Sequence, residues 1–218
     1  MAEAAAYEDR VKTSFDSLLR EIDGFFMQTG PVHQSLQALI RRLDEAAIPY
    51  ALLGAIALGK HGLLRVTVDI DILMTTEGLA RFKERYLGLG YVPAFPGAAK
   101  TFRDTATGVR IDVLTTGDYP GDGRPKPVRF PDPADSVEID GARVVALERL
   151  IELKLASGMT AEHRLSDLGD VQSLIRAAKL PADLADRLDP SVQPRYRDLW
   201  KKAQTVDRVV EGEGIVSK

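Results

Sequence analysis

The stretch Tyr50–Met74 reads YALLGAIALGKHGLLRVTVDIDILM. It begins with mostly apolar residues, turns at Gly54, and ends in an apolar segment that carries two acids, Asp69 and Asp71. Apolar content, β-branched residues and glycine punctuation predict a short buried strand at 50–53, a brief helix at 55–61 and a second strand at 66–74. Gly54 therefore lies at the turn from a strand into a helix.

The two acids of the second strand need an explanation, because Asp is a poor strand former. Residues i and i+2 of a strand point to the same face, about 6.6–7 Å apart along it. Asp69 and Asp71 thus flank a small gap while Ile70 packs into the core. This geometry suits one or two magnesium ions, which prefer oxygen ligands. Taken alone, the pair also fits a half-exposed strand with a solvated polar face.

Two neighbouring features favour the metal site. Asp112 lies in another apolar strand candidate and is a third carboxylate, although a solvated strand face is open for it too. Gly54 and Ala55 stand at a helix start, where backbone N–H groups bind phosphate and small residues let it approach closely. We therefore expect a metal and phosphate site built from these residues.

The remaining segments predict an α+β fold, with a mixed β-sheet flanked by helices. We expect an N-terminal helical extension (1–47), a sheet-bearing core (48–145) and a C-terminal helical region (146–218) packed on the core. Helices are predicted at 11–22, between the break at Gly30-Pro31 and Pro49, and at 77–87, 147–156, 162–178, 182–188 and 194–206. Hairpins are predicted at 101–103 with 109–114 and at 137–139 with 142–144. Residues 115–135 are rich in glycine and proline, and two interpretations stay open for them, a binding loop or lid and a stiff surface connection.

Composition narrows the chemistry. The chain has no cysteine, which excludes disulfides and thiolate metal sites, so a metal would rely on carboxylates and on the imidazoles of His33, His61 and His163. A net charge of −3 neither steers the chain to nucleic acid nor away from it. We expect no signal peptide and no membrane span, and hence a cytoplasmic location.

The pattern Leu53-Gly54-Ala55, thirteen residues, then Asp69-Ile70-Asp71-Ile72 resembles the signature of the DNA polymerase β-type nucleotidyltransferase superfamily. Ala55 stands where that signature usually has Gly or Ser; it stays small and keeps the backbone donor but lacks a hydroxyl. With His61-Gly62 and Arg65-Val66-Thr67, the stretch is similar to AbiEii-type nucleotidyltransferases, toxin-like proteins of bacterial abortive-infection and toxin–antitoxin systems. Lys154 and the stretch Arg164–Asp170 extend this resemblance, which runs from about Pro49 to Ile175.

The resemblance implies a nucleotidyltransferase fold and the transfer of a nucleoside monophosphate from a nucleoside triphosphate to an acceptor hydroxyl. Asp69 and Asp71 would hold Mg²⁺, one or two ions, and Asp112 would complete the second metal site or take the acceptor's proton. Nucleotide binding would fall to Gly54, Ala55, Arg65 and Lys154, and Lys154 and Asp167 would join the acids as catalytic residues.

Other interpretations stay open for the outer residues. Lys154 either reaches the triphosphate or extends to solvent along its helix. Asp167 and Asp170 share a helix face, where they orient Lys154 or Arg164, contact substrate, or form a surface ion pair with Arg164. Arg65 either contacts phosphate or a carboxylate, or is a solvated residue at a strand edge.

The resemblance also implies partners. The acceptor would be a tRNA end, a protein or a small molecule, and an antitoxin is a further expected partner. Basic residues that either follow a phosphate backbone or are plain solvated surface are Arg124, Lys126, Arg129, Arg195, Arg197, Lys201 and Lys202. The alternative function is a non-catalytic nucleotidyltransferase-like binding module, which Ala55 favours. A metal-dependent phosphohydrolase is disfavoured by the scarcity of histidine.

Overall fold

The computed structural model describes residues 29–212, with side chains described as far as Thr205. The helix expected at 11–22 lies outside these residues. Contacts divide the chain into two compact units. The first contains the chain as far as Gly59, Leu64–Thr116 and Pro131–Val145, and the second contains Lys60–Leu63, Gly117–Phe130 and the chain from Ala146 onward. The three-part division expected from the sequence stays a prediction.

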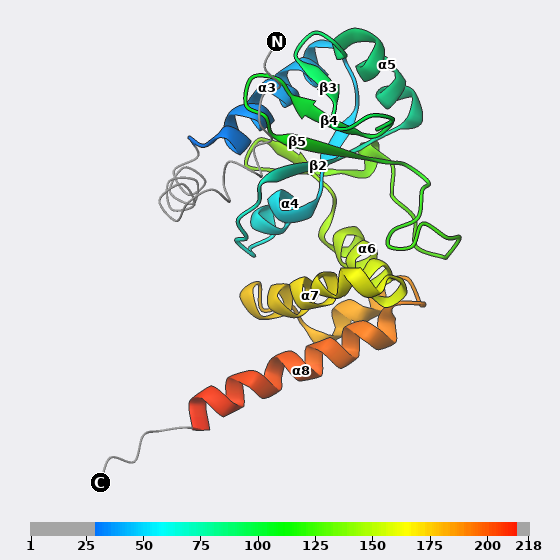
Figure 1. Ribbon diagram of the computed structural model, residues 1–218. Coiled ribbons are helices and arrows are strands. Elements are labelled where there is room, and N and C mark those ends of the chain that lie inside the picture. Colours follow the sequence, from blue (N-terminus) through cyan, green and yellow to red (C-terminus); the bar gives the residue numbers. More distant parts are fainter. Residues whose placement is uncertain (1–28, 213–218) are drawn as a thin grey trace. The chain divides into compact units, whose positions relative to one another are not determined.

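The first unit is built on a seven-stranded mixed sheet with the strand order β3-β4-β5-β2-β1-β7-β6 (Figure 1). The strands are β1 (Tyr50–Leu52), β2 (Asp69–Met74), β3 (Tyr91–Pro93), β4 (Thr101–Asp104), β5 (Arg110–Thr115), β6 (Val137–Ile139) and β7 (Ala142–Val144). β2 pairs in parallel with β5, and β1 with β7, whereas the other neighbours are antiparallel. The predicted fold class, a mixed sheet flanked by helices, is confirmed.

Within residues 29–145, three α-helices lie beside the sheet. α3 (Pro31–Glu45) and α5 (Thr76–Tyr86) lie on one side of it, and the short α4 (Gly54–Lys60) lies on the other (Figure 1). The ring centroid of Phe82, on α5, lies 5.1 Å from that of Tyr91 and 5.4 Å from that of Phe102. Burying such aromatic side chains contributes strongly to a core. The face of the sheet toward α3 and α5 is therefore apolar and closed.

The two predicted hairpins are confirmed. β4 pairs with β5 in antiparallel fashion, and β6 pairs with β7 across a turn at Asp140 and Gly141. Both turn residues have positive φ angles, 48° and 72°. Two successive positive φ angles are the mark of the type I′ turn, whose twist matches that of the flanking strands.

Several predicted boundaries are wrong for identifiable reasons. β2 begins at Asp69 rather than Val66, because its parallel neighbour β5 begins at the paired residue, Arg110. Alternating β-branched residues do not make a strand where no neighbour is present to pair with. The missed strand β3 lies at the sheet edge and ends in Pro93, a residue that edge strands tolerate.

The second unit is helical. It contains α6 (Leu147–Thr160), α7 (Leu165–Ala177) and α8 (Gln193–Gly212), with 3-10 turns at Glu162–Arg164 and Ala182–Arg187 in place of continuous α-helix. α6 contacts α7, and α7 contacts α8. Within the described part of the chain, no helix combines the length and apolar character needed to cross a membrane.

The segment Gly117–Phe130 belongs to this helical unit and is not structureless. Two backbone hydrogen bonds of 2.9 Å join its ends. The Gly117 amide donates to the Phe130 carbonyl oxygen, and the Phe130 amide donates to the Asp118 carbonyl oxygen. A Cβ at Gly121 would lie 2.9 Å from the Ser157 backbone, so the segment approaches α6 as closely as a glycine allows. Loops that are closed at their base and packed in this way are compact units in their own right.

A buried hydrogen bond ties α3 to the far end of β4. The Ser35 hydroxyl donates to Asp104 Oδ2 at 2.6 Å, and the Ala106 amide donates to the other carboxylate oxygen at 2.9 Å. Ser35 is fully buried, and Asp104 is 5% exposed. Leaving a buried hydroxyl without its acceptor costs more than the hydrogen bond itself contributes.

We expect Asp104→Ala to lower the free energy of unfolding by about 2–3 kcal/mol, since it strands the Ser35 hydroxyl and removes a charge-assisted acceptor. Urea denaturation followed by circular dichroism measures this change. Asp135→Ala, at an exposed aspartate of the same unit, is the control and should change stability by less than about 0.5 kcal/mol. Equal effects of the two substitutions would show that the Ser35 contact is unimportant.

Candidate active site

Three carboxylates lie on one face of the sheet, on two adjacent parallel strands. In the register of β2 and β5, Asp71 stands opposite Asp112, and Asp69 stands opposite Arg110. These four residues are half-buried, whereas Ile70 and Ile111 between them are fully buried toward the helices. The predicted geometry of Asp69 and Asp71, with the intervening residue in the core, is what the strand adopts.

Arg110 lies among the carboxylates, and the sequence assigned it no role. Its Nη2 donates to Asp69 Oδ2 at 2.8 Å, and its Nε lies 3.1 Å from Asp112 Oδ2 as an ion pair without the alignment of a hydrogen bond. Asp69 is also held from its other side, because the Thr67 hydroxyl donates to Asp69 Oδ1 at 2.6 Å. The orientation of Asp69 is thus set by a cation and by a hydroxyl group.

Gly54 touches the acidic face directly. It adopts a φ of +57°, and a Cβ added there would overlap Asp71 Oδ2. The preceding amide, that of Leu53, donates to the Asp71 carbonyl oxygen at 3.0 Å. Both the backbone conformation of Gly54 and the space around it therefore require glycine. The first turn of α4, with Ala55, begins beside the Asp71 carboxylate.

The donor set has the chemistry of a site for a hard divalent cation, since carboxylate oxygens are the ligands that Mg²⁺ prefers. Among the described residues, however, no three carboxylate or imidazole side chains converge into a ready-made metal cluster. The ion pairs of Arg110 draw Asp69 and Asp112 toward the guanidinium. The three carboxylates have the ligand chemistry that a metal needs and lie on the same face of the sheet. Their side chains would have to rearrange before they could bind one ion together.

Arg65 and the expected strand start lie outside regular structure. The segment from Gly62 to Val68 is neither helix nor strand, and the Arg65 side chain is exposed. Leu64 is 63% exposed and Val66 is 42% exposed. The assignment of Arg65 to nucleotide binding stays a prediction.

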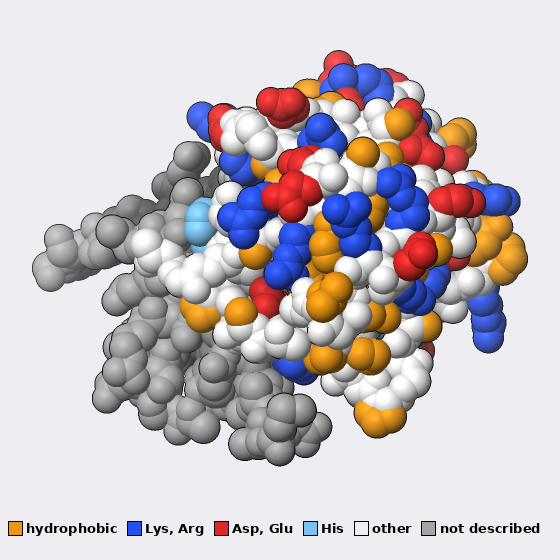
Figure 2. All heavy atoms as spheres, turned by 90° about the horizontal axis from the view of Figure 1, so that it is seen from above, with side chains coloured by type: hydrophobic (Ala, Val, Ile, Leu, Met, Phe, Trp, Pro, Cys, Tyr) orange, Lys and Arg blue, Asp and Glu red, His pale blue; other side chains and the backbone are white. Residues whose placement is uncertain are grey.

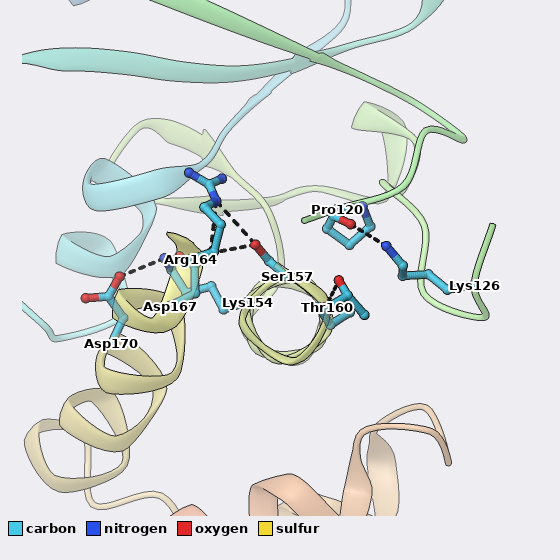
Figure 3. Close-up of polar contacts among 9 residues, drawn as sticks. Pro120, Lys126, Lys154, Ser157, Thr160, Arg164, Asp167 and Asp170 are labelled. Atoms are coloured by element: carbon cyan, nitrogen blue, oxygen red, sulfur yellow. Dashed lines mark hydrogen bonds and ion pairs between the residues drawn. The ribbon is translucent and has the colours of Figure 1, made fainter. Parts of the chain in front are cut away.

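A second charged cluster lies within the helical unit, where α6 meets α7 (Figure 3). Lys154 Nζ donates to Asp167 Oδ1 at 2.9 Å and to Asp170 Oδ2 at 2.8 Å. Lys154 is only 9% exposed, so its amine does not extend to solvent along the helix. Of the arrangements that the sequence left open, two are present: both aspartates hold Lys154, and Asp167 also forms an ion pair with Arg164. Nucleotide contact by Lys154 and catalysis by Asp167 stay predictions.

Ser157 and Arg164 complete this cluster around Asp167. The Ser157 hydroxyl donates to Asp167 Oδ2 at 2.7 Å, and Arg164 Nε lies 3.4 Å from the same oxygen. Burial of the Asp167 carboxyl opposes its ionisation, but the Lys154 ammonium and the Ser157 hydroxyl outweigh this, so its pKa lies below the usual 3.8. Ser157 was missed in the sequence, although it lies three residues after Lys154 and thus on the same helix face.

Most of the basic residues proposed to follow a phosphate backbone have local partners. In the loop, Lys126 bonds to the Pro120 carbonyl (Figure 3) and Arg129 stacks on Tyr119. On α8, carboxylates pair with Arg195, Arg197 and Lys202. Figure 2 looks from above the view of Figure 1 and shows a face on which basic side chains lie among acidic and apolar ones. A role of these residues in nucleic-acid binding stays a prediction.

Comparison with known proteins adds information about the fold. No family model and no curated protein matches the chain. Among solved structures, it is similar to ANT(2")-Ia in complex with adenylyl-2"-tobramycin, with a TM-score of 0.50 and 13% identity over 76% of this chain and 96% of that one. It is also similar to the solution structure of the antibiotic-resistance factor ANT(2'')-Ia, with a TM-score of 0.43 and 13% identity over 81% of this chain and 95% of that one. The architecture is that of a nucleotidyltransferase fold. The resemblance to the AbiEii branch stays a prediction.

We expect Gly54→Ala to disturb the acidic face specifically, because the new Cβ would overlap the Asp71 carboxylate. It should cost about 1–3 kcal/mol of stability and abolish divalent-cation binding measured by calorimetry. Gly59→Ala is the matched control, since it lies in the same helix with nothing within 4 Å of a new Cβ. A Gly54→Ala protein that binds Mn²⁺ like the parent would contradict this role.

The lowered pKa of Asp167 predicts a pH dependence of stability. A carboxylate with a depressed folded-state pKa stabilises the fold above its unfolded-state pKa and loses this contribution as the pH falls through the folded-state value. The deficit of Asp167→Asn relative to the parent should therefore be full at pH 7 and shrink below about pH 4. Urea denaturation at several pH values measures it, with the exposed Asp183→Asn as control. A deficit that is constant down to pH 3 would contradict the assignment.

Proposed function

We propose that this chain is a metal-dependent nucleotidyltransferase, which moves a nucleoside monophosphate from a nucleoside triphosphate to an acceptor hydroxyl. The observation that carries the proposal is the placement of Asp69, Asp71 and Asp112 on one face of two adjacent parallel strands, against the backbone of Gly54. The nucleotidyltransferase fold supports it as well.

The reaction is a substitution at phosphorus. The acceptor oxygen attacks the α-phosphorus, the bond to the bridging oxygen of the β-phosphate breaks, and pyrophosphate leaves. A bound Mg²⁺ would supply charge neutralisation at the attacking and leaving oxygens. The remaining catalysis in transfers of this kind is positioning and electrostatic stabilisation, which two interior strands of the sheet, β2 and β5, would provide.

Each residue has a role in this proposal. Asp69 and Asp71 hold the metal, and Asp112, opposite Asp71, completes a second metal position or accepts the proton of the acceptor hydroxyl. The backbone at Gly54 and Ala55 lies beside the acids and takes the phosphates. Arg65 contributes positive charge to the triphosphate.

In the helical unit, Lys154 is proposed as a further phosphate ligand. Asp167 and Asp170 hold its amine in one position, at 2.9 and 2.8 Å. Asp167 would thus act through Lys154 in this proposal.

The acceptor class is the open part of the function. The resemblance in sequence favours a tRNA end or a protein hydroxyl and a toxin partnered by an antitoxin, whereas ANT(2")-Ia was solved with an adenylylated tobramycin. A small polyhydroxylated acceptor therefore belongs in the same test.

We expect transfer of label from one or more α-labelled nucleoside triphosphates, in the presence of Mg²⁺, to an acceptor in a panel of tRNA, protein partners and aminoglycosides. Asp71→Asn should lower the rate by about 100-fold or more, because changes around the ligands of a metal already cost about 10–100-fold and this substitution alters a proposed ligand itself. Asp135→Asn, at an exposed aspartate of the same unit, should leave the rate unchanged.

The same experiment separates the alternative. A folded protein that binds Mg²⁺ and nucleotide but transfers label to no acceptor would support a non-catalytic binding module. Equal nucleotide binding by the parent and by Asp69→Asn and Asp71→Asn would contradict the metal assignment itself.

A further inference from the structure

Arg110 places a permanent positive charge within the acidic face. Its guanidinium contacts Asp69 at 2.8 Å and Asp112 at 3.1 Å, and so joins the two strands that carry the acids. Arginine stays protonated at every physiological pH. With 39% of its side chain exposed, Arg110 has solvent into which it can move. The charge is therefore fixed in sign, and part of the side chain that carries it faces solvent.

This charge compensates a repulsion that the strand register imposes. Asp71 and Asp112 stand directly opposite each other, and Asp69 is two residues away on the same face. Like charges on facing positions of neighbouring strands destabilise a sheet. A guanidinium between two of the three acids offsets part of that cost while the site holds no other cation.

Arg110 contacts one oxygen, Oδ2, of each of Asp69 and Asp112, and these two carboxylates are also proposed metal ligands. A Mg²⁺ ion binds carboxylate oxygen at about 2.1 Å, and a guanidinium that contacts the same carboxylates would then lie only a few ångströms from the ion. Two cations at that separation repel each other strongly outside bulk water. Metal and arginine therefore cannot both hold Asp69 and Asp112 in their best geometry.

We propose that Arg110 is a built-in competitor of the metal, which keeps free divalent cations weakly bound so that the metal enters together with the triphosphate. The inference rests on the proposed function and deepens it. The negative charge of the nucleotide phosphates favours the metal at the acids and offers Arg110 a second partner once it has left Asp69 and Asp112. Arg110 is thus a positioning residue that acts through the carboxylates.

A purely structural role for Arg110 predicts the opposite sign. If the arginine only held the carboxylates in the correct orientation, its removal would scatter them and weaken metal binding. If it competes with the metal, its removal leaves the acids uncompensated and strengthens metal binding. The sign of the change in metal affinity thus decides between the two roles.

The test is calorimetric titration of the full chain with Mn²⁺ and with Mg²⁺, without nucleotide. Arg110→Met, which keeps the apolar stem and removes the charge, should bind the metal about tenfold more tightly or more. Arg110→Lys, which keeps the charge but loses the fork that reaches two carboxylates, should fall between Met and the parent. Arg85→Met, an exposed arginine on α5, is the control for loss of one positive charge and should bind like the parent.

Thermal unfolding gives a second readout that does not depend on activity. The rise in melting temperature from EDTA to excess Mg²⁺ should be larger for Arg110→Met than for the parent, because the variant has lost its internal counter-ion. Equal or weaker metal binding by Arg110→Met and Arg110→Lys, with the parent binding metal and transferring label, would overturn the inference and leave the proposed function standing. Absence of metal binding in every variant and in the parent would overturn both.

Discussion

The parallel pairing of β2 with β5 is the constraint on which the site depends. Its register brings two aspartates of one strand beside an arginine and an aspartate of another, and it alternates these charged residues with fully buried isoleucines. Because side chains in a strand repeat every second residue, a shift of one residue would send the acids into the aromatic core around Phe82. The apolar face against α5 thus fixes the register, and the register fixes where the charges meet.

Two glycines allow the backbone to come close to neighbouring side chains, and each lies beside one of the charged clusters. Gly54 leaves room for the Asp71 carboxylate, and in the helical unit a Cβ at Gly158 would lie 2.6 Å from Leu168 of α7. The second contact lets α6 and α7 come close enough for Lys154 to meet two aspartates of α7. Each charged cluster therefore depends on a neighbouring glycine, Gly54 or Gly158, at which a side chain would have no space.

Much of this was predictable from sequence, because the signals were local. The alternation of side chains along a strand predicted that Asp69 and Asp71 share one face, and Asp112 was recognised as an acid in another apolar strand. The turn at Asp140-Gly141 located the hairpin of the strands on either side of it. The contact of Arg110 with Asp69 was not predictable, because it joins residues 41 positions apart and follows only from which strand pairs with β2. The predicted first residue of β2 was wrong for the same reason, because the strand begins only where β5 is present to pair with it. Ser157, by contrast, was available from helical spacing to Lys154 and was overlooked.

The segment Gly117–Phe130 leaves the sheet-bearing unit and returns to it, and in between it joins the helical unit, where Gly121 meets α6. The two units are consequently not consecutive pieces of the polypeptide, since the chain passes from one to the other several times before Ala146. A cut at any single peptide bond would leave one unit with a piece missing. During synthesis, the loop is made before α6, the helix against which Gly121 packs, so this contact can form only after α6 has been synthesised as well.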